Sequence, residues 1–209
     1  MRPRVKICGI TNLRDALCAA EAGADYLGFI LYHKSPRYVA PDKAALIIRQ
    51  LPEHVTPVGV FVNETRTAID AAVSGCGIRL IQLSGNESPD DCRNYPVPVW
   101  KAFRFPERLE VSRIADFQLE AALLDGARNG EYGGSGHPAD LSIAGEMKAY
   151  HRLVLAGGLS PENIVDVIAS VAPFAVDVNS GVEHAPGIKD HAKVFELFRK
   201  MEITGTDNQ

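Results

Sequence analysis

Short apolar segments alternate with segments of helical spacing along the whole chain, and this alternation constrains the fold more than any other feature. Eight apolar segments recur, each rich in β-branched residues, as is typical of parallel strands covered on both faces. They span residues 5–8, 26–31, 58–62, 80–83, 97–103, 121–124, 153–156 and 175–178. Parallel strands are joined by right-handed crossovers, so the pattern predicts an α/β fold with a parallel sheet.

The segments between these stretches carry apolar residues three or four positions apart, which predicts amphipathic helices. The clearest sets are Leu13, Leu17 and Ala20, then Ile69, Ala72 and Val73, and finally Val194, Leu197 and Phe198. Capping patterns predict helix starts at Asn12, at Asn63 with Thr65 close by, and at Ser160-Pro161-Glu162. The fourth to sixth helices are the least clearly marked, because that region holds Pro89, Pro96, Pro98 and Pro106.

The count of eight strands, each followed by a helix, favours a closed (β/α)₈ TIM barrel. An open doubly wound sheet stays the alternative. The chain has 209 residues, near the lower size limit of such a barrel, so we expect a single domain over residues 1–203. Residues 204–209 are polar and predict a frayed C-terminal tail.

The composition excludes several classes of protein. Apolar residues make up 46% and charged residues 23% of the chain, close to the globular average, so a disordered chain is excluded. A formal net charge of −4 argues against nucleic acid or a membrane surface as a partner, and no apolar run approaches the length of a membrane span. We therefore expect a cytoplasmic location.

Four cysteines stand at Cys8, Cys18, Cys76 and Cys92, without the spacing of a metal site. No export signal supports disulfides, and Cys18 and Cys76 are predicted to be small core residues. We expect no bound metal.

Polar residues and glycines gather where the predicted strands end, which is where barrels of this type place their chemistry. Gly157-Gly158 and Ser180-Gly181 follow the last two strands and predict a phosphate site built from backbone N–H groups. The alternative is that these glycines only make tight turns. A third cluster, Gly133-Gly134-Ser135-Gly136, lacks the lysine of a nucleotide-binding P-loop. It is expected to be a mobile active-site loop or a plain flexible connection.

Cys8 and Asp125 end the first and sixth predicted strands. If both point inward, a thiol and a carboxyl face one pocket from opposite sides, and one can accept a proton while the other donates one. The alternative for Cys8 is a buried small residue. Lys6 shares the face of Cys8 and could raise the thiolate fraction, although a lysine inside a barrel more often pairs with a carboxylate such as Asp177.

Seven segments, taken together, resemble the phosphoribosylanthranilate isomerase family, in the family's order from residue 4 to about residue 200. They are KICGIT at 6–11, GF at 28–29, SPRYV at 35–39, VGVFVN at 58–63, LLD at 123–125, LAGGL at 155–159 and DVNSGVE at 177–183. One departure is Ser84, where the family usually shows a histidine, and this puts in doubt a ligand contact from that strand.

The resemblance implies a TIM barrel and a cofactor-free Amadori rearrangement of a phosphorylated substrate in tryptophan biosynthesis. It implies that Cys8 is the general base and Asp125 the general acid, and that Arg37 binds the anthranilate carboxylate. Asp177 is expected to contact the sugar or amino group, and Gly157, Gly158, Ser180 and Gly181 to bind the phosphate. The chain is expected to be a monomer or a homodimer.

Three rival functions can be weighed against this one, and the last of them fails. A related isomerase that acts on another aminoaldose would carry a carboxylate where this chain has Cys8. A non-catalytic barrel that binds a phosphorylated ligand is supported only by Ser84. A thiol hydrolase would need a histidine at the end of a neighbouring strand, and none of the predicted strands ends in one.

Overall fold

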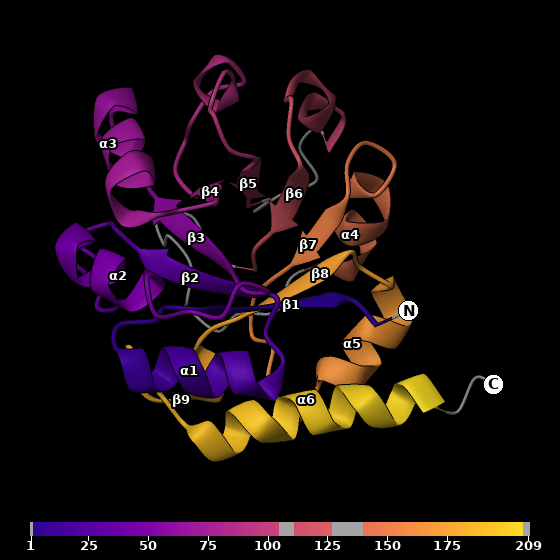
Figure 1. Cartoon of the computed structure of the whole chain (residues 1–209). Coiled ribbons are helices and arrows are strands. Elements are labelled where there is room, and N and C mark those ends of the chain that lie inside the picture. The colour runs from indigo at the N-terminus through magenta and orange to yellow at the C-terminus, as the bar shows by residue number, and fades with distance from the viewer. Residues whose placement is uncertain (1, 105–110, 127–139, 207–209) are drawn as a thin grey trace.

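The computed structural model describes residues 2–104, 111–126 and 140–206, the last four of these without their side chains. Eight parallel strands close into a barrel, because β1 pairs with β2 on one side and with β8 on the other. They are β1 Arg4–Cys8, β2 Tyr26–Ile30, β3 Thr56–Phe61, β4 Leu80–Leu83, β5 Val99–Phe103, β6 Ala121–Leu124, β7 Leu153–Leu155 and β8 Ala175–Val178. The predicted TIM barrel is confirmed and the open-sheet alternative is wrong (Figure 1).

Helices surround the barrel, but not after every strand. They are α1 Leu13–Ala22, α2 Pro41–Ile48, α3 Arg66–Cys76, α4 Leu141–Met147, α5 Ile164–Val171 and α6 His191–Thr206. In the described residues after β4 and β5, the helical segments are short 3₁₀ helices: η1 Asp90–Cys92, a single turn, and η2 Val111–Asp116, two turns. The prediction of a full helix after β4 is therefore wrong, and Pro89, Pro96 and Pro98 explain it because proline stops a helix from propagating.

The last strand leads into features that the pattern did not predict. After β8 come a 3₁₀ turn, η3 Ser180–Val182, and a small antiparallel hairpin of β9 Glu183–Ala185 and β10 Ile188–Lys189. α6 then runs through Thr206, so the helix includes residues 204–206 of the expected tail. The glycine loop at 133–136 lies outside the described residues.

The predicted helix starts agree with the structure at two of three positions, and at the second of these the cap is Thr65. Asn12 caps α1, because its side chain accepts a hydrogen bond from the Asp15 backbone N–H. Thr65 rather than Asn63 caps α3, through a bond from the Ala68 N–H. The start predicted at Ser160 is wrong: α5 begins at Ile164, and residues 161–163 form a turn in which the Asn163 side chain accepts from the Ser160 N–H.

The strands are buried on both faces, which explains their near-continuous apolar sequences. Inward side chains fill the barrel, with Tyr26 and Trp100 packed edge to face, their ring centroids 4.8 Å apart. Outward side chains pack against the helices in separate clusters. Because inward and outward positions alternate, the residue that follows Leu123 by two, Asp125, also points inward, at the carboxyl end of the barrel.

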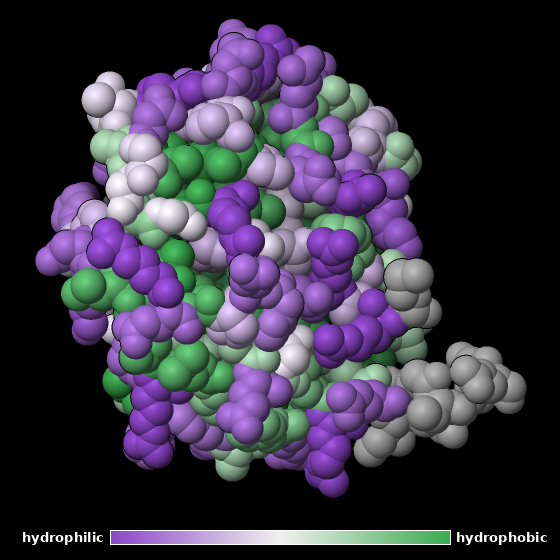
Figure 2. All heavy atoms as spheres, viewed as in Figure 1, coloured by the Kyte–Doolittle hydropathy of each residue, from purple (hydrophilic) through white to green (hydrophobic). Residues whose placement is uncertain are grey.

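The surface is mixed in character. Figure 2 shows polar residues over much of one face, with apolar side chains between them. The large apolar side chains that are exposed include Leu46 at 60% and Ile188 at 47%. Across the described ranges, no helix is both long enough and apolar enough to cross a bilayer.

Candidate active site

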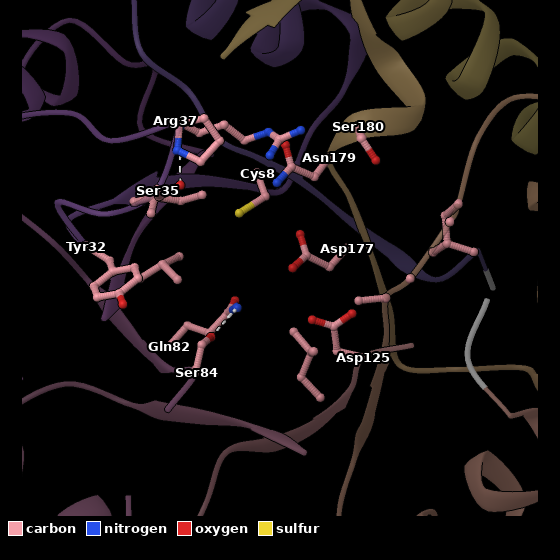
Figure 3. Close-up of a pocket in the computed structure, with 18 of the residues that line it drawn as sticks. Cys8, Tyr32, Ser35, Arg37, Gln82, Ser84, Asp125, Asp177, Asn179 and Ser180 are labelled. Atoms are coloured by element: carbon pink, nitrogen blue, oxygen red, sulfur yellow. Dashed lines mark hydrogen bonds between the residues drawn. The ribbon is translucent and has the colours of Figure 1, made fainter. Parts of the chain in front are cut away.

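A cavity of about 320 Å³ lies at the carboxyl ends of the strands. It brings together most of the side chains and glycines that the sequence singled out, from segments far apart in the chain (Figure 3). Those lining it are Cys8, Arg37, Asp125, Gly157, Gly158, Asp177 and Ser180. Gly181 does not line the cavity. A Cβ added there would overlap the carbonyl oxygen of Leu159, so Gly181 lets the loops after β7 and β8 pack together.

Cys8 is the last residue of β1 and is 4% exposed. Its neighbour in the sheet is Gly28, whose missing side chain leaves room for the sulfur: a Cβ at Gly28 would lie 2.8 Å from Cys8 Sγ. Burial raises the pKa of the Cys8 thiol, while the ammonium of Lys6 pulls that pKa the other way. The thiol is therefore mostly protonated at neutral pH.

The sequence left two roles open for Lys6, stabilising the Cys8 thiolate or pairing with Asp177, and the position of Lys6 is compatible with both. Its Nζ donates to the two carboxylate oxygens of Asp177, at 2.8 and 2.9 Å, and its charge also favours the thiolate form of Cys8. Lys6 is fully buried, yet its pKa is raised, because Asp177 and Cys8 together outweigh the effect of burial. A buried cation thus joins a carboxylate and a thiol on the inner face of the barrel.

Asp125 faces the same cavity from the other side, next to the end of β6 (Figure 3). Its backbone N–H donates to the Phe103 carbonyl at 3.1 Å, which continues the sheet by one residue and fixes the direction of the side chain. Arg104 Nη2 lies 3.9 Å from the carboxylate, and Arg104 Nη1 donates to the Ser84 carbonyl at 2.9 Å. The carboxyl is thereby held toward Cys8 and Asp177.

Arg37 lines the cavity with its guanidinium held from behind by Glu183. Nε donates to both carboxylate oxygens, at 2.9 and 3.0 Å, and Nη2 donates to one at 2.7 Å. Glu183 also accepts from Lys189 Nζ at 3.0 Å and from the Gly187 N–H at 3.1 Å. Burial raises the pKa of Glu183, but Arg37 and Lys189 outweigh it and lower the pKa overall, so the carboxylate is charged. Within the described part of the chain no bond is assigned to Nη1 of Arg37, which leaves that edge for a ligand.

The loops after β7 and β8 hold the residues from which the sequence predicts a phosphate site. Gly157 and Gly158 have φ values of 92° and 64°, a left-handed backbone that favours glycine. In the described residues, the backbone N–H groups of Gly157, Gly158 and Ser180 have no assigned protein partner. These donors meet at one end of the cavity, so an anion there would receive hydrogen bonds from unpaired backbone groups.

Sequence reasoning gave no role to Gln82, Glu183 and Lys189. Gln82 lines the cavity, and its Nε2 donates to Ser84 Oγ at 3.1 Å. Its Oε1 is buried and, among the described residues, without a partner. Strand alternation could have found Gln82, because it lies two residues before Ser84 on the same face. Glu183 and Lys189 reach the site through the hairpin β9–β10, which no pattern predicted.

Metal-binding groups do not cluster in the described ranges: no three His, Cys, Asp or Glu side chains converge there as ligands for one ion. Cys18, Cys76 and Cys92 are buried free thiols, and none of them lines the cavity.

Known proteins resemble this chain over nearly its whole length. A family model described as N-(5′-phosphoribosyl)anthranilate (PRA) isomerase matches residues 5–200. An N-(5′-phosphoribosyl)anthranilate isomerase from Trichlorobacter lovleyi is 49% identical over 197 residues, which are 94% of this chain and 96% of that protein.

Two solved structures extend the comparison to the fold. Monomers generated from the dimeric phosphoribosylanthranilate isomerase of Thermotoga maritima superpose with a TM-score of 0.85 at 40% identity, covering 96% of this chain and 98% of that one. A phosphoribosyl anthranilate isomerase in complex with reduced 1-(o-carboxyphenylamino)-1-deoxyribulose 5-phosphate gives a TM-score of 0.84 at 40% identity, with the same coverage.

Proposed function

The chain belongs to the N-(5′-phosphoribosyl)anthranilate isomerase family, and we propose that Cys8 and Asp125 perform its reaction as base and acid. The enzyme converts N-(5-phosphoribosyl)anthranilate to 1-(2-carboxyphenylamino)-1-deoxyribulose 5-phosphate in tryptophan biosynthesis. The observation that carries the assignment is that the Cys8 thiol and the Asp125 carboxyl line one cavity from opposite sides.

The ends of the cavity support one orientation of the substrate. We assign the phosphate to the backbone N–H groups of Gly157, Gly158 and Ser180, with Gly181 allowing the two loops to approach each other. The anthranilate carboxylate then lies toward Arg37, whose Nη1 side can pair with a planar carboxylate while Glu183 holds the other edge. Asp177 lies between these ends, and we assign it a contact with the sugar or amino group.

The proposed reaction moves protons at two atoms of the substrate. Asp125 protonates the furanose ring oxygen, and the C1–O bond breaks as the anthranilate nitrogen donates its electron pair to form an iminium. The iminium acidifies the hydrogen on the second sugar carbon, and the Cys8 thiolate removes that proton. The electrons of the C–H bond then neutralise the nitrogen and leave an enolamine, which tautomerises to the ketone. The substrate nitrogen is the electron sink, so the chemistry requires no cofactor.

Two further properties stay predictions. The relative from Thermotoga maritima is described as dimeric, and we propose that this chain is a monomer or a homodimer, to be decided by sedimentation equilibrium. A cytoplasmic location is proposed from the sequence alone.

The acid–base assignment is tested with Cys8→Ser and Asp125→Asn, which keep the size of each side chain. Turnover, followed as the loss of anthranilate fluorescence from the substrate, should fall by about 10²–10⁴-fold in each variant. Binding of reduced product analogue should stay within a few-fold of the unchanged protein, because neither group holds the phosphate or the carboxylate. Cys92→Ser is the matched control and should retain turnover. Normal turnover in Cys8→Ser would exclude Cys8 as the base.

A further inference from the structure

We propose that Lys6 is a positioning residue that stabilises the thiolate of Cys8, and that Asp177 limits this effect by competing for the same ammonium. The inference rests on the proposed role of Cys8 as the base. It addresses a difficulty in that role: a buried thiol is a weak base unless something favours its charged form.

The geometry brings the two side chains together on one strand. Lys6 and Cys8 are two residues apart on β1 and both face the barrel interior, so their side chains lie side by side. Both lean over Gly28: a Cβ there would lie 2.8 Å from Cys8 Sγ and 2.9 Å from Lys6 Nζ. Glycine at this position leaves room for the thiol and the ammonium on the same side of the backbone, close enough for the charge of Lys6 to act on Cys8.

Asp177 completes the group from the neighbouring strand. β8 pairs with β1 in a register that sets Asp177 beside Lys6, and both carboxylate oxygens accept from the Lys6 ammonium. The ammonium of Lys6 therefore interacts with two groups, the Asp177 carboxylate and the Cys8 thiol. Asp177 is itself an anion near Cys8 and acts on the thiol in the sense opposite to Lys6.

The other charged groups around Cys8 lie on separate elements. Lys189 of β10 favours the thiolate, but its Nζ is already bonded to Glu183 and Asn179. Arg37 is paired with Glu183, and Asp125 lies across the cavity. Of the described cations, Lys6 alone shares the strand of Cys8, borders Gly28 together with it and also pairs with a carboxylate that lines the cavity. Removing Lys6 and removing Asp177 should therefore change the ionisation of Cys8 in opposite directions.

The test titrates Cys8 alone. In a chain carrying Cys18→Ala, Cys76→Ala and Cys92→Ala, the thiolate absorbance near 240 nm is followed against pH. Lys6→Met should move the midpoint up by about one unit or more, since an adjacent opposite charge is lost. Asp177→Asn should move it down, since the ammonium then has the thiolate as its only anionic neighbour. A residue that only supports the fold would not give shifts of opposite sign.

A second buried lysine provides the matched control. Lys101 on β5 is 3% exposed and pairs at 3.1 Å with Glu87, which lies in the loop after β4, so neither residue is on the strand that carries Cys8. Lys101→Met and Glu87→Gln should leave the Cys8 midpoint unchanged. Equal midpoints in Lys6→Met, Asp177→Asn and the unchanged protein, or shifts of the same sign, would overturn the inference. If Lys6→Met does not fold, the double variant Lys6→Met/Asp177→Asn, which removes the pair together, replaces it, and its midpoint should lie above that of Asp177→Asn.

The failure of this inference and that of the proposed function can be told apart. The absorbance titration reports on Lys6 whether or not Cys8 takes part in turnover. Midpoint shifts of opposite sign combined with normal turnover in Cys8→Ser would support the positioning role of Lys6 and reject Cys8 as the base. Unchanged midpoints combined with an inactive Cys8→Ser variant would support Cys8 as the base and reject the positioning role of Lys6.

Discussion

Two groups in this molecule have the same chemical composition, a cysteine, a lysine and a carboxylate, and they lie on opposite sides of the barrel wall. The first is Cys8, Lys6 and Asp177, on the inner faces of β1 and β8 beside the cavity. The second is Cys92, Lys101 and Glu87, where Cys92 packs in an apolar cluster outside the sheet. We call them the inner triad and the outer triad.

The two triads hold their charges differently. In the inner triad the pKa of Lys6 is raised, because Asp177 and the neighbouring thiol outweigh burial. In the outer triad burial outweighs Glu87, and the pKa of Lys101 is lowered. Burial also raises the pKa of Cys92 to about 12, so that thiol stays protonated. The same three residue types thus give a thiol and a carboxylate that line the cavity in one place, and a thiol enclosed by apolar side chains in the other.

The carboxylates differ in how many partners they have. Glu87 accepts from the backbone N–H groups of Asn63 and Gly85 as well as from Lys101. Asp177 has Lys6 as its only assigned donor within the described ranges. Buried ion pairs are weak evidence for stability, because desolvation opposes the attraction. Asp177 therefore has oxygen lone pairs that remain available to a ligand in the cavity, as the proposed contact with the substrate requires.

The largest expected effect that separates the triads is on stability. Lys6→Met leaves Asp177 buried with no assigned donor, and we expect the free energy of unfolding to fall by about 3–5 kcal/mol. Lys101→Met leaves Glu87 with its two backbone donors, and a loss of about 1–3 kcal/mol is expected. Urea denaturation at pH 7 measures both. Equal losses would mean that the backbone donors of Glu87 do not compensate for the lost lysine, and the two carboxylates would not differ as proposed.

The fold could be predicted from the strands because parallel strands buried on both faces leave continuous apolar segments in the sequence. The predicted segments 80–83, 121–124 and 175–178 have the same bounds as β4, β6 and β8. The helix after β4 was predicted wrongly from the alternation of strands and helices, although the prolines in that region already weakened the prediction. The start at Ser160 failed because the side chain of Asn163 folds back and makes a turn before α5.

The site could be predicted in part, since strand alternation places Cys8 and Asp125 inward at strand ends. What the sequence could not supply was tertiary pairing. Arg37 and Glu183 are 146 residues apart, and only the closed barrel brings them together. Likewise, the choice between two partners for Lys6 could not be made from β1 alone, because Asp177 comes from β8.

The rate of thiol alkylation gives a second contrast between Cys8 and Cys92. Alkylation requires the thiolate, so the rate at Cys8 should rise about tenfold per unit of pH below its pKa. Because burial raises that pKa, the rate at pH 7 should be lower than that of a free thiol and should keep rising through pH 9. Cys92, with its pKa of about 12 and no cavity, should stay unlabelled. Peptide mass spectrometry after iodoacetamide treatment measures both sites.

Two outcomes would weaken that contrast. Labelling of Cys92 as fast as Cys8 would show that the outer triad opens to solvent. A Cys8 rate that does not change with pH would show that the thiolate is already fully formed. Product analogue bound in the cavity should slow labelling of Cys8, which confirms that the reagent enters there.

The smallest expected effect concerns what each sulfur contributes to the fold. Cys92 is 2% exposed and packs among apolar side chains. Cys92→Ala should therefore lower the free energy of unfolding by about 1–2 kcal/mol, because it removes packing contacts and leaves a small enclosed cavity. Cys8 borders an existing cavity, so Cys8→Ala enlarges a space that water already reaches, and we expect a change within about 0.5 kcal/mol. Urea denaturation of the two variants measures the difference. A larger loss in Cys8→Ala would mean that the inner sulfur is held for packing, and the distinction between a chemical and a structural triad would then rest on charge alone.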